Sequence, residues 1–226
     1  GKRLCIVIQN GRRTEGKNLT GVDLALILLA TIWGLNFSIV KQTITEMLPM
    51  AFTALRLTVA SFFLTFLLLA REGGFIINMR DSKWIMLLGF LGHTAYQVFF
   101  INGIARTTAA ETALIMATNP VLVFLLSVVA RLEPLSFGRI ISTILSMSGV
   151  VMVVGGSEAS IASLSHIAGN LLVFGGSVSW AAYTVLMKPK LLQYSALRLT
   201  ATTMVFGTVA IDAIAIPSLC NQDWSK

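Results

Sequence analysis

Two arginines stand inside long apolar runs, where a charged side chain is costly to bury. Arg56 and Arg198 each form the centre of an Ala-Leu-Arg-Leu-Thr segment. A charge at such a position usually faces a partner or a water-filled cavity, so both are candidates for a substrate site. The alternative is that each guanidinium reaches out to a lipid headgroup or forms a structural pair. We expect Glu111 to be the partner of Arg56.

Aromatic and polar side chains recur three residues apart in two other apolar runs. Trp33 and Asn36 form one pair, and Trp180 and Tyr183 form the other, so each pair shares one face of a helix. Such side chains can line a cavity with aromatic surface and hydrogen-bonding groups. Anchoring at a membrane interface or helix packing would explain the tryptophans equally well. Further candidates of the same kind are His93, Tyr96, Gln97 and Asn119.

Proton chemistry is a second candidate activity, through Glu111, Asp212 or His93. A lone helical histidine is more often a packed, hydrogen-bonded residue, and Asp212 could simply face water. No HExxH or GxSxG motif and no pair of acidic metal ligands occurs within an apolar run. The sequence therefore predicts neither an enzyme nor a metal or cofactor site.

The elements that must position these residues are membrane-spanning helices. Hydrophobic residues make up 55% of the chain and charged residues 12%, and the mean hydropathy is +0.81. A soluble domain is about one quarter charged, and a helix crosses the hydrocarbon with about 20 apolar residues. Seven such runs predict an all-α polytopic membrane protein, with spans near 22–40, 50–70, 84–102, 108–130, 138–155, 167–187 and 193–216.

Three local features refine this prediction. Pro120 removes the hydrogen bond to the Met116 carbonyl and should bend the fourth span, with Asn119 helping to satisfy that carbonyl. Small residues on the fourth and sixth spans should allow close helix approach. Glu133, beside Pro134, should cap or orient a helix end.

Basic residues gather in alternate connections, which predicts the orientation of the chain. By the positive-inside rule the N-terminus is cytoplasmic, and residues 1–21 form a cytoplasmic tail. The predicted cytoplasmic set is Lys2, Arg3, Arg12, Arg13, Lys17, Arg71, Arg80, Lys83, Arg131, Arg139, Lys188 and Lys190. The net charge of +7 therefore indicates topology and not nucleic-acid binding.

Two segments occur twice in the same order. WGLNFSIVK at 33–41 has a counterpart WAAYTVLMK at 180–188, and the ALRLT segment at 54–58 returns at 196–200. A repeat of about this length holds five spans, and an odd number of spans forces the second copy into the membrane upside down. Inverted repeats place a binding site near the midplane between the copies and open it alternately to each side. This is the architecture of a carrier.

Five motifs in order resemble the drug/metabolite transporter superfamily, in its EamA-type branch. They are IWGLNF with Lys41, the ALR of the second span, TTAAETALIMATNPVLVFLLSVVARLEPLS, SGVVMVVGG and SWAAYTVLMK. The resemblance implies a ten-span exporter with two inverted five-span repeats, a central cavity and substrates such as amino acids, nucleotide-related metabolites or drugs. It implies a first repeat at 22–155 and an incomplete second repeat at 167–226.

The same resemblance suggests a fragment that lacks three helices. By the pseudo-symmetry of the repeat, the equivalent of Glu111 that would pair with Arg198 lies on a helix that this chain does not contain. The implied partners are a small-molecule substrate and the lipid bilayer, without nucleic acid, in a bacterial inner membrane. The sequence does not indicate an oligomeric state. A channel-like pore and a membrane-embedded enzyme remain the alternatives. A seven-span receptor or retinal protein is disfavoured, because the N-terminus is predicted inside and the seventh span has no lysine.

Overall fold

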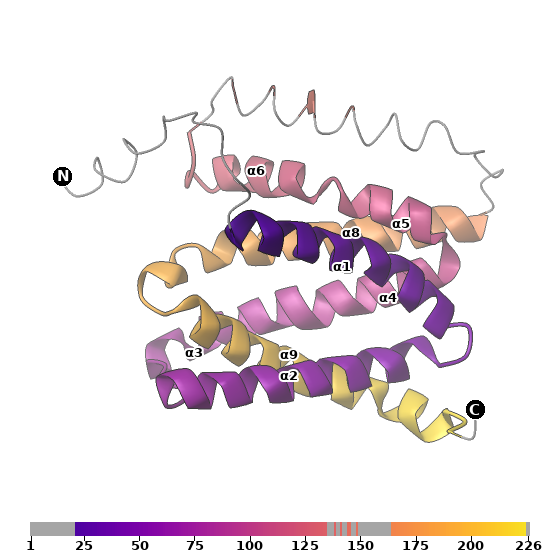
Figure 1. Cartoon of the computed structure of the whole chain (residues 1–226), viewed down its shortest axis with the longest axis horizontal. Helices are drawn as coiled ribbons and strands as arrows, with labels where there is room; N and C mark the ends of the chain where they lie inside the picture. Colours follow the sequence, from indigo (N-terminus) through magenta and orange to yellow (C-terminus); the bar gives the residue numbers. More distant parts are fainter. Residues whose placement is uncertain are drawn as a thin grey trace. The chain divides into compact units, whose positions relative to one another are not determined.

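A computed structural model describes residues 21–134 and 164–224, with Gly138, Ile141, Ile144, Leu145 and Ser148, and its helices appear in Figure 1. The described residues form helices joined by turns and short irregular stretches, and none of them lies in a strand, as the all-α prediction requires. Six helical segments are long and apolar enough to cross a membrane: Gly21–Thr43, Pro49–Glu72, Met79–Arg106, Ala109–Val129, His166–Leu192 and Ala196–Asn221. The predicted span 138–155 and tail 1–21 lie almost wholly outside the described residues. The count of seven therefore stays a prediction.

The chain divides into two compact units, Gly1–Asn36 and Phe37–Lys226. The first helix, α1 (Gly21–Thr43), begins in the first unit and ends in the second. The next helix, α2 (Pro49–Glu72), starts with a proline in its first turn, where the missing N–H costs nothing. It ends at Gly73, whose left-handed φ of 74° suits glycine and whose N–H bonds the Leu69 carbonyl.

The third apolar segment changes its helical pitch in the middle. It runs as α3 (Met79–Gly89), the π-helical segment η1 (Phe90–Ala95) and α4 (Tyr96–Arg106). A π-helical turn inserts an extra residue and often marks a functional position in a helix. His93 lies in this turn.

The fourth apolar segment breaks where Pro120 predicts a bend. It consists of α5 (Ala109–Met116) and α6 (Asn119–Val129). The helix is interrupted between Met116 and Asn119, directly before Pro120, so the predicted bend at this proline is confirmed.

Thr108 begins α5 with a capping box, because its hydroxyl accepts the Glu111 N–H and the Glu111 carboxylate accepts the Thr108 N–H.

The last helices are α8 (Leu164–Met187), the short η2 (Lys190–Leu192) and α9 (Ala196–Asn221). Ser195 caps α9 by accepting the Arg198 N–H at 3.0 Å. Pro217 lies inside α9 and cannot donate a backbone hydrogen bond to Ala213.

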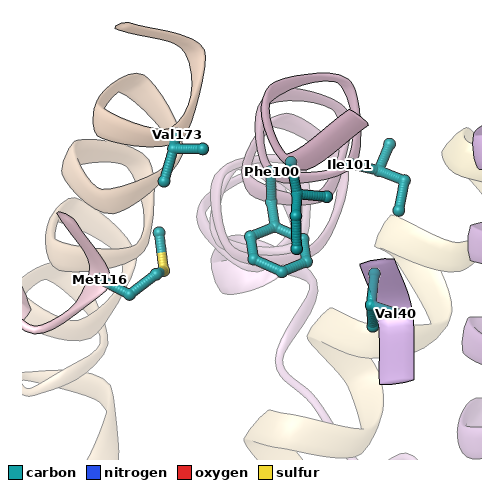
Figure 2. Packing of buried hydrophobic residues seen from close by; sticks show 6 residues of the cluster. Val40, Phe100, Ile101, Met116 and Val173 are labelled. Atoms are coloured by element: carbon teal, nitrogen blue, oxygen red, sulfur yellow. The ribbon is translucent and has the colours of Figure 1, made fainter. Parts of the chain in front are cut away.

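Within the second unit, α8 packs against α4 and α9 packs against α2. Glycines permit the close approach, since a Cβ at Gly103 would lie 2.6 Å from a Val173 methyl carbon. Figure 2 shows one core cluster that joins these elements, with labelled side chains from the end of α1, α4, α5 and α8. The large apolar side chains on the outer face of α2 stay exposed, as lipid-facing residues do; they include Phe62, Phe63 and Phe66.

Contacts at the helix ends fix the directions of α2 and α9. The Leu48 N–H before α2 bonds Gln222 after α9 at 2.7 Å, and Ser195 before α9 donates to Glu72 at the end of α2 at 2.6 Å. The two helices therefore run in opposite directions.

The end of α1 and the start of α8 meet the same end of α4. Lys41 donates to the Ile104 carbonyl at 2.7 Å, while Gly169 lies against Arg106. The last turn of α1 and the first turns of α8 therefore both lie at the end of α4.

Candidate functional site

Aromatic rings from η1, α4 and α8 form a continuous row, which we call the aromatic row. Trp180 lies at its centre, with ring centroids 5.2 Å from Tyr96 and 5.3 Å from Tyr183. His93 extends the row beyond Tyr183 at 5.5 Å, and Phe100 extends it beyond Tyr96 at 5.7 Å. The spacing explains the arrangement, because residues three, four and seven apart lie on one helix face. The structure therefore brings together Tyr96, Trp180 and Tyr183.

His93 is packed against its neighbours in this row. Its side chain is buried, and its Nε2 lies 3.4 Å from the Thr203 hydroxyl of α9. Tyr183 meets the same hydroxyl at 3.4 Å. The environment of His93 is that of a packed, hydrogen-bonded histidine, which was the commoner of its two interpretations.

Arg56 reaches from α2 to α4. Its guanidinium donates to the Gln97 side-chain carbonyl at 3.0 Å and lies 5.4 Å from the centre of the Phe52 ring. Gln97 is buried and follows Tyr96 directly, so the Arg56–Gln97 hydrogen bond lies next to the aromatic row. A guanidinium is planar and positively charged, and it carries several N–H donors. At this place it can therefore bind a carboxylate or phosphate.

Asn119 and Tyr96 meet at the sulfur of Met116. The Asn119 amide nitrogen lies 3.7 Å and the Tyr96 hydroxyl 4.0 Å from that Sδ. The prediction that Asn119 satisfies the Met116 carbonyl is wrong, because the break in the helix turns its amide toward the sulfur. Asn119 nevertheless lies beside the aromatic row.

Glu111 lies in a different polar group, at the start of α5 and α8. Its carboxylate accepts from the Thr107 hydroxyl and the Thr108 N–H, and lies 3.8 Å from His166 Nδ1. Thr107 also donates to Asn170 at 2.6 Å. The expected pairing with Arg56 is wrong, since among the described residues the capping box holds Glu111 to its own helix end.

Arg198 has an acidic partner within the chain. Its guanidinium lies 3.1 Å from Glu72, at the other end of the α2–α9 pair from Gln222. The antiparallel packing of α2 and α9 brings the end of one helix to the start of the other, which explains this pair; the predicted counterpart of Glu111 on a helix outside the chain stays a prediction. Arg198 lies near the start of α9, five residues before Thr203, whose hydroxyl contacts His93 and Tyr183 of the aromatic row.

Two more ion pairs surround the connection between α8 and α9. Lys188 lies 2.7 Å from Glu133 and donates to Ser127 at 2.9 Å. Lys190 pairs with Asp81 at 2.5 Å. Together with Arg198–Glu72, we call these the connection ion pairs. Glu133 thus joins the end of α6 to the end of α8.

Trp33 and Asn36 lie one turn apart on α1, in the first compact unit. Their cavity role stays a prediction, as does that of the other candidates. The sequence interpretation missed Phe100 and Met116, although Phe100 follows Tyr96 at helical spacing. It also missed Thr107, Asn170 and His166, which no local pattern connects to Glu111. Within residues 21–134 and 164–224, no three His, Cys, Asp or Glu side chains come together as a metal site.

Comparison with known proteins adds a family to this geometry. Residues 20–155 match the EamA-like transporter family. An uncharacterized transporter of Archaeoglobus fulgidus is 28% identical over 189 residues, which are 83% of this chain and 65% of the relative. The uncharacterized transporter YyaM of Bacillus subtilis is 27% identical over 86% of this chain and 65% of its own length.

A third relative carries a more specific name. The probable terminal-alkyne amino-acid exporter of Streptantibioticus cattleyicolor is 28% identical over 82% of this chain and 61% of its own length. The chain thus spans about two thirds of the length of the curated relatives that it matches. No solved structure matches the chain.

Proposed function

We propose, from the premise that this chain belongs to the EamA-like transporter family, that the protein is part of a secondary transporter that exports small metabolites by alternating access. The family and the names of its relatives indicate a transporter rather than an enzyme. Its multiple apolar helices make it a multi-pass membrane protein. The substrate, the direction of transport and the alternating-access mechanism are our proposals.

The observation that carries the proposal is the aromatic row beside the Arg56–Gln97 pair. The residues come from three separate helical segments, α2, α4 and α8, and Arg56 lies seven residues after Pro49, the first residue of α2. A charged side chain inside an apolar span is costly and usually faces a partner or a water-filled cavity. The rings supply an apolar surface next to the guanidinium.

This chemistry fits substrates with an anionic group and an apolar or aromatic part, such as amino acids or certain drugs. Arg56 can bind a carboxylate, and Tyr96 and Trp180 can stack on a side chain. The amino-acid exporter named among the relatives supports the same class.

The helix directions support an inverted repeat. The two ALRLT segments lie on α2 and α9, and these two helices run in opposite directions. We therefore propose a first five-helix repeat at 22–155 and the beginning of its inverted copy at 167–226. Alternating access then follows from motion of one repeat against the other.

The charge distribution supports an orientation. The connection between α8 and α9 carries Lys188 and Lys190, and the one after α2 carries Arg71. By the positive-inside rule we propose that these connections and the N-terminus are cytoplasmic, in a bacterial inner membrane.

Counterflow in proteoliposomes tests the proposed function. The full-length protein is reconstituted with an unlabelled amino acid inside, and uptake of the same labelled amino acid is followed across a panel. A carrier gives saturable, transient accumulation that Trp180→Ala weakens, whereas the control Trp84→Ala, outside the aromatic row, keeps it. Flux that never saturates would favour a channel-like pore and contradict the proposal.

A further inference from the structure

An aspartate lies deep inside α9, well away from both helix ends. Asp212 is nine residues before the end of α9 at Asn221, which is about 14 Å at 1.5 Å per residue. Its side chain is half-buried against α2. An acid at this depth is expensive and usually functional.

The described partner of Asp212 is a neutral hydroxyl. Thr58 of α2 lies 3.2 Å and 3.0 Å from the two carboxylate oxygens, so its single proton is shared between them. The contact adjoins the apolar cluster of Leu57, Ile211 and Ala215. The α2–α9 interface thus holds the carboxylate in place without a positive charge in this contact.

Three other described carboxylates lie beside lysine or arginine: Glu72, Asp81 and Glu133 belong to the connection ion pairs. A fourth, Glu111, lies 3.8 Å from His166 Nδ1. Asp212 differs from Glu72, Asp81 and Glu133 because its described contact is with a neutral hydroxyl.

A threonine hydroxyl can serve both protonation states. While Asp212 is ionised, the Thr58 hydroxyl donates to it. When Asp212 gains a proton, its new O–H can donate to the Thr58 oxygen, and the threonine proton can turn to the Ala54 carbonyl one turn earlier. Neither side chain loses its hydrogen bond in either state, so the proton can bind and leave at low cost.

The charged groups on the elements packed against α9 have partners of their own. Arg56 of α2 donates to Gln97, and His93 of η1 contacts Tyr183 and Thr203. The other charged residues of α2, α3 and η2 lie toward the connection between α8 and α9: Arg71, Glu72, Arg80, Asp81, Lys83 and Lys190. Asp212 is therefore separated from that charged end by more than three helical turns of α9.

We propose that Asp212 binds and releases the proton that couples substrate movement to a proton gradient, and that Thr58 positions it. This rests on the proposed transport function. The step is a plain proton transfer: water on one side supplies a proton that forms the carboxylic O–H, and the same bond breaks to release it on the other side.

Infrared difference spectroscopy tests proton binding without any substrate. Full-length protein is titrated from neutral to mildly acidic pH in detergent, and the C=O stretch of protonated carboxylic acids is followed. We expect one component of this band to vanish in Asp212→Asn and to persist in Asp223→Asn, a matched change at an exposed aspartate. If the band is the same in Asp212→Asn as in the unchanged protein, the proposal is wrong.

A pair of threonine variants keeps the test informative if Asp212→Asn does not fold. Thr58→Val removes the hydroxyl at nearly constant shape and should shift the frequency of that C=O component, because the carboxylic group loses its hydrogen-bond partner. Thr58→Ser keeps the hydroxyl and should restore the frequency. Equal frequencies for all three proteins would overturn the positioning role of Thr58.

A transport measurement separates this inference from the function on which it rests. In proteoliposomes, a pH gradient should drive uptake by the unchanged protein but not by Asp212→Asn, which should keep counterflow exchange. Gradient-driven uptake by Asp212→Asn refutes the coupling role while the transporter proposal stands. If the unchanged protein shows no counterflow, the transporter proposal fails, and the infrared titration still decides whether Asp212 binds a proton.

Discussion

Replacing Gly207 by alanine should loosen the contact between α9 and the π-helical turn. A Cβ at Gly207 would lie 2.3 Å from the Cβ of His93 and 2.8 Å from the Gly89 carbonyl oxygen. Neither atom is the free end of a flexible side chain, so the helices must move apart. Gly175 of α8 is a matched control, because its added Cβ would meet the Phe99 ring at an ordinary 3.8 Å.

The magnitude follows from two opposing terms. Overpacking of this kind costs about 1–3 kcal/mol, and alanine in a helix interior is about 1 kcal/mol more favourable than glycine. The second term is common to both variants, so Gly207→Ala should be less stable than Gly175→Ala by about 1–3 kcal/mol. At about 2–4 °C per kcal/mol for a chain of this size, their melting temperatures should differ by about 2–12 °C.

Thermal unfolding of the detergent-solubilised protein measures this difference. Both variants are purified by the same protocol and heated while the loss of helical circular dichroism is followed. Gly175→Ala should match the unchanged protein or exceed it. If both variants melt at the same temperature, the close approach of α9 to η1 is not as the structure describes it.

Three further changes probe the candidate site and the connection ion pairs. Arg56→Lys cannot reproduce the guanidinium contact with Gln97, and the loss of such a hydrogen bond costs about 1.5–3 kcal/mol. Counterflow should therefore fall about tenfold or more. Unchanged counterflow would remove Arg56 from the site. Tyr96→Phe, which keeps the ring and its stacking, should retain most of the counterflow that Tyr96→Ala loses. A double-mutant cycle on Lys188 and Glu133 should give a coupling free energy of only about 0.2–1 kcal/mol for unfolding, because both side chains are partly exposed. A coupling several times larger would show that the pair is more desolvated than the structure indicates.

Features set by composition and by proline could be predicted from the sequence. Six of the seven predicted spans correspond to helices of sufficient length, and the break before Pro120 lies where its missing N–H requires it. The π-helical turn at Phe90–Ala95 was not predicted. Its cause is tertiary: Gly92 lies against the Tyr183 ring, and a local pattern in one helix does not contain that contact.

The candidate site was predictable where its residues share a helix face. The pairing of Trp180 with Tyr183 follows from their spacing, but the contact of Trp180 with Tyr96 depends on how α8 packs on α4. Electrostatic partners were the least predictable. Arg198 meets Glu72, 126 positions away in the numbering, because two antiparallel helices bring their opposite ends together.

Thiol accessibility at the two ends of the helices tests the carrier mechanism most directly. Single cysteines replace Asn170, next to Thr107, and Ser127, next to Lys188, in the full-length protein without its native cysteines. Labelling by a membrane-impermeant reagent is measured in right-side-out and inside-out vesicles, with and without a transported amino acid. Alternating access predicts that the substrate raises labelling at one position and lowers it at the other. Labelling that rises or falls at both positions together would contradict the account.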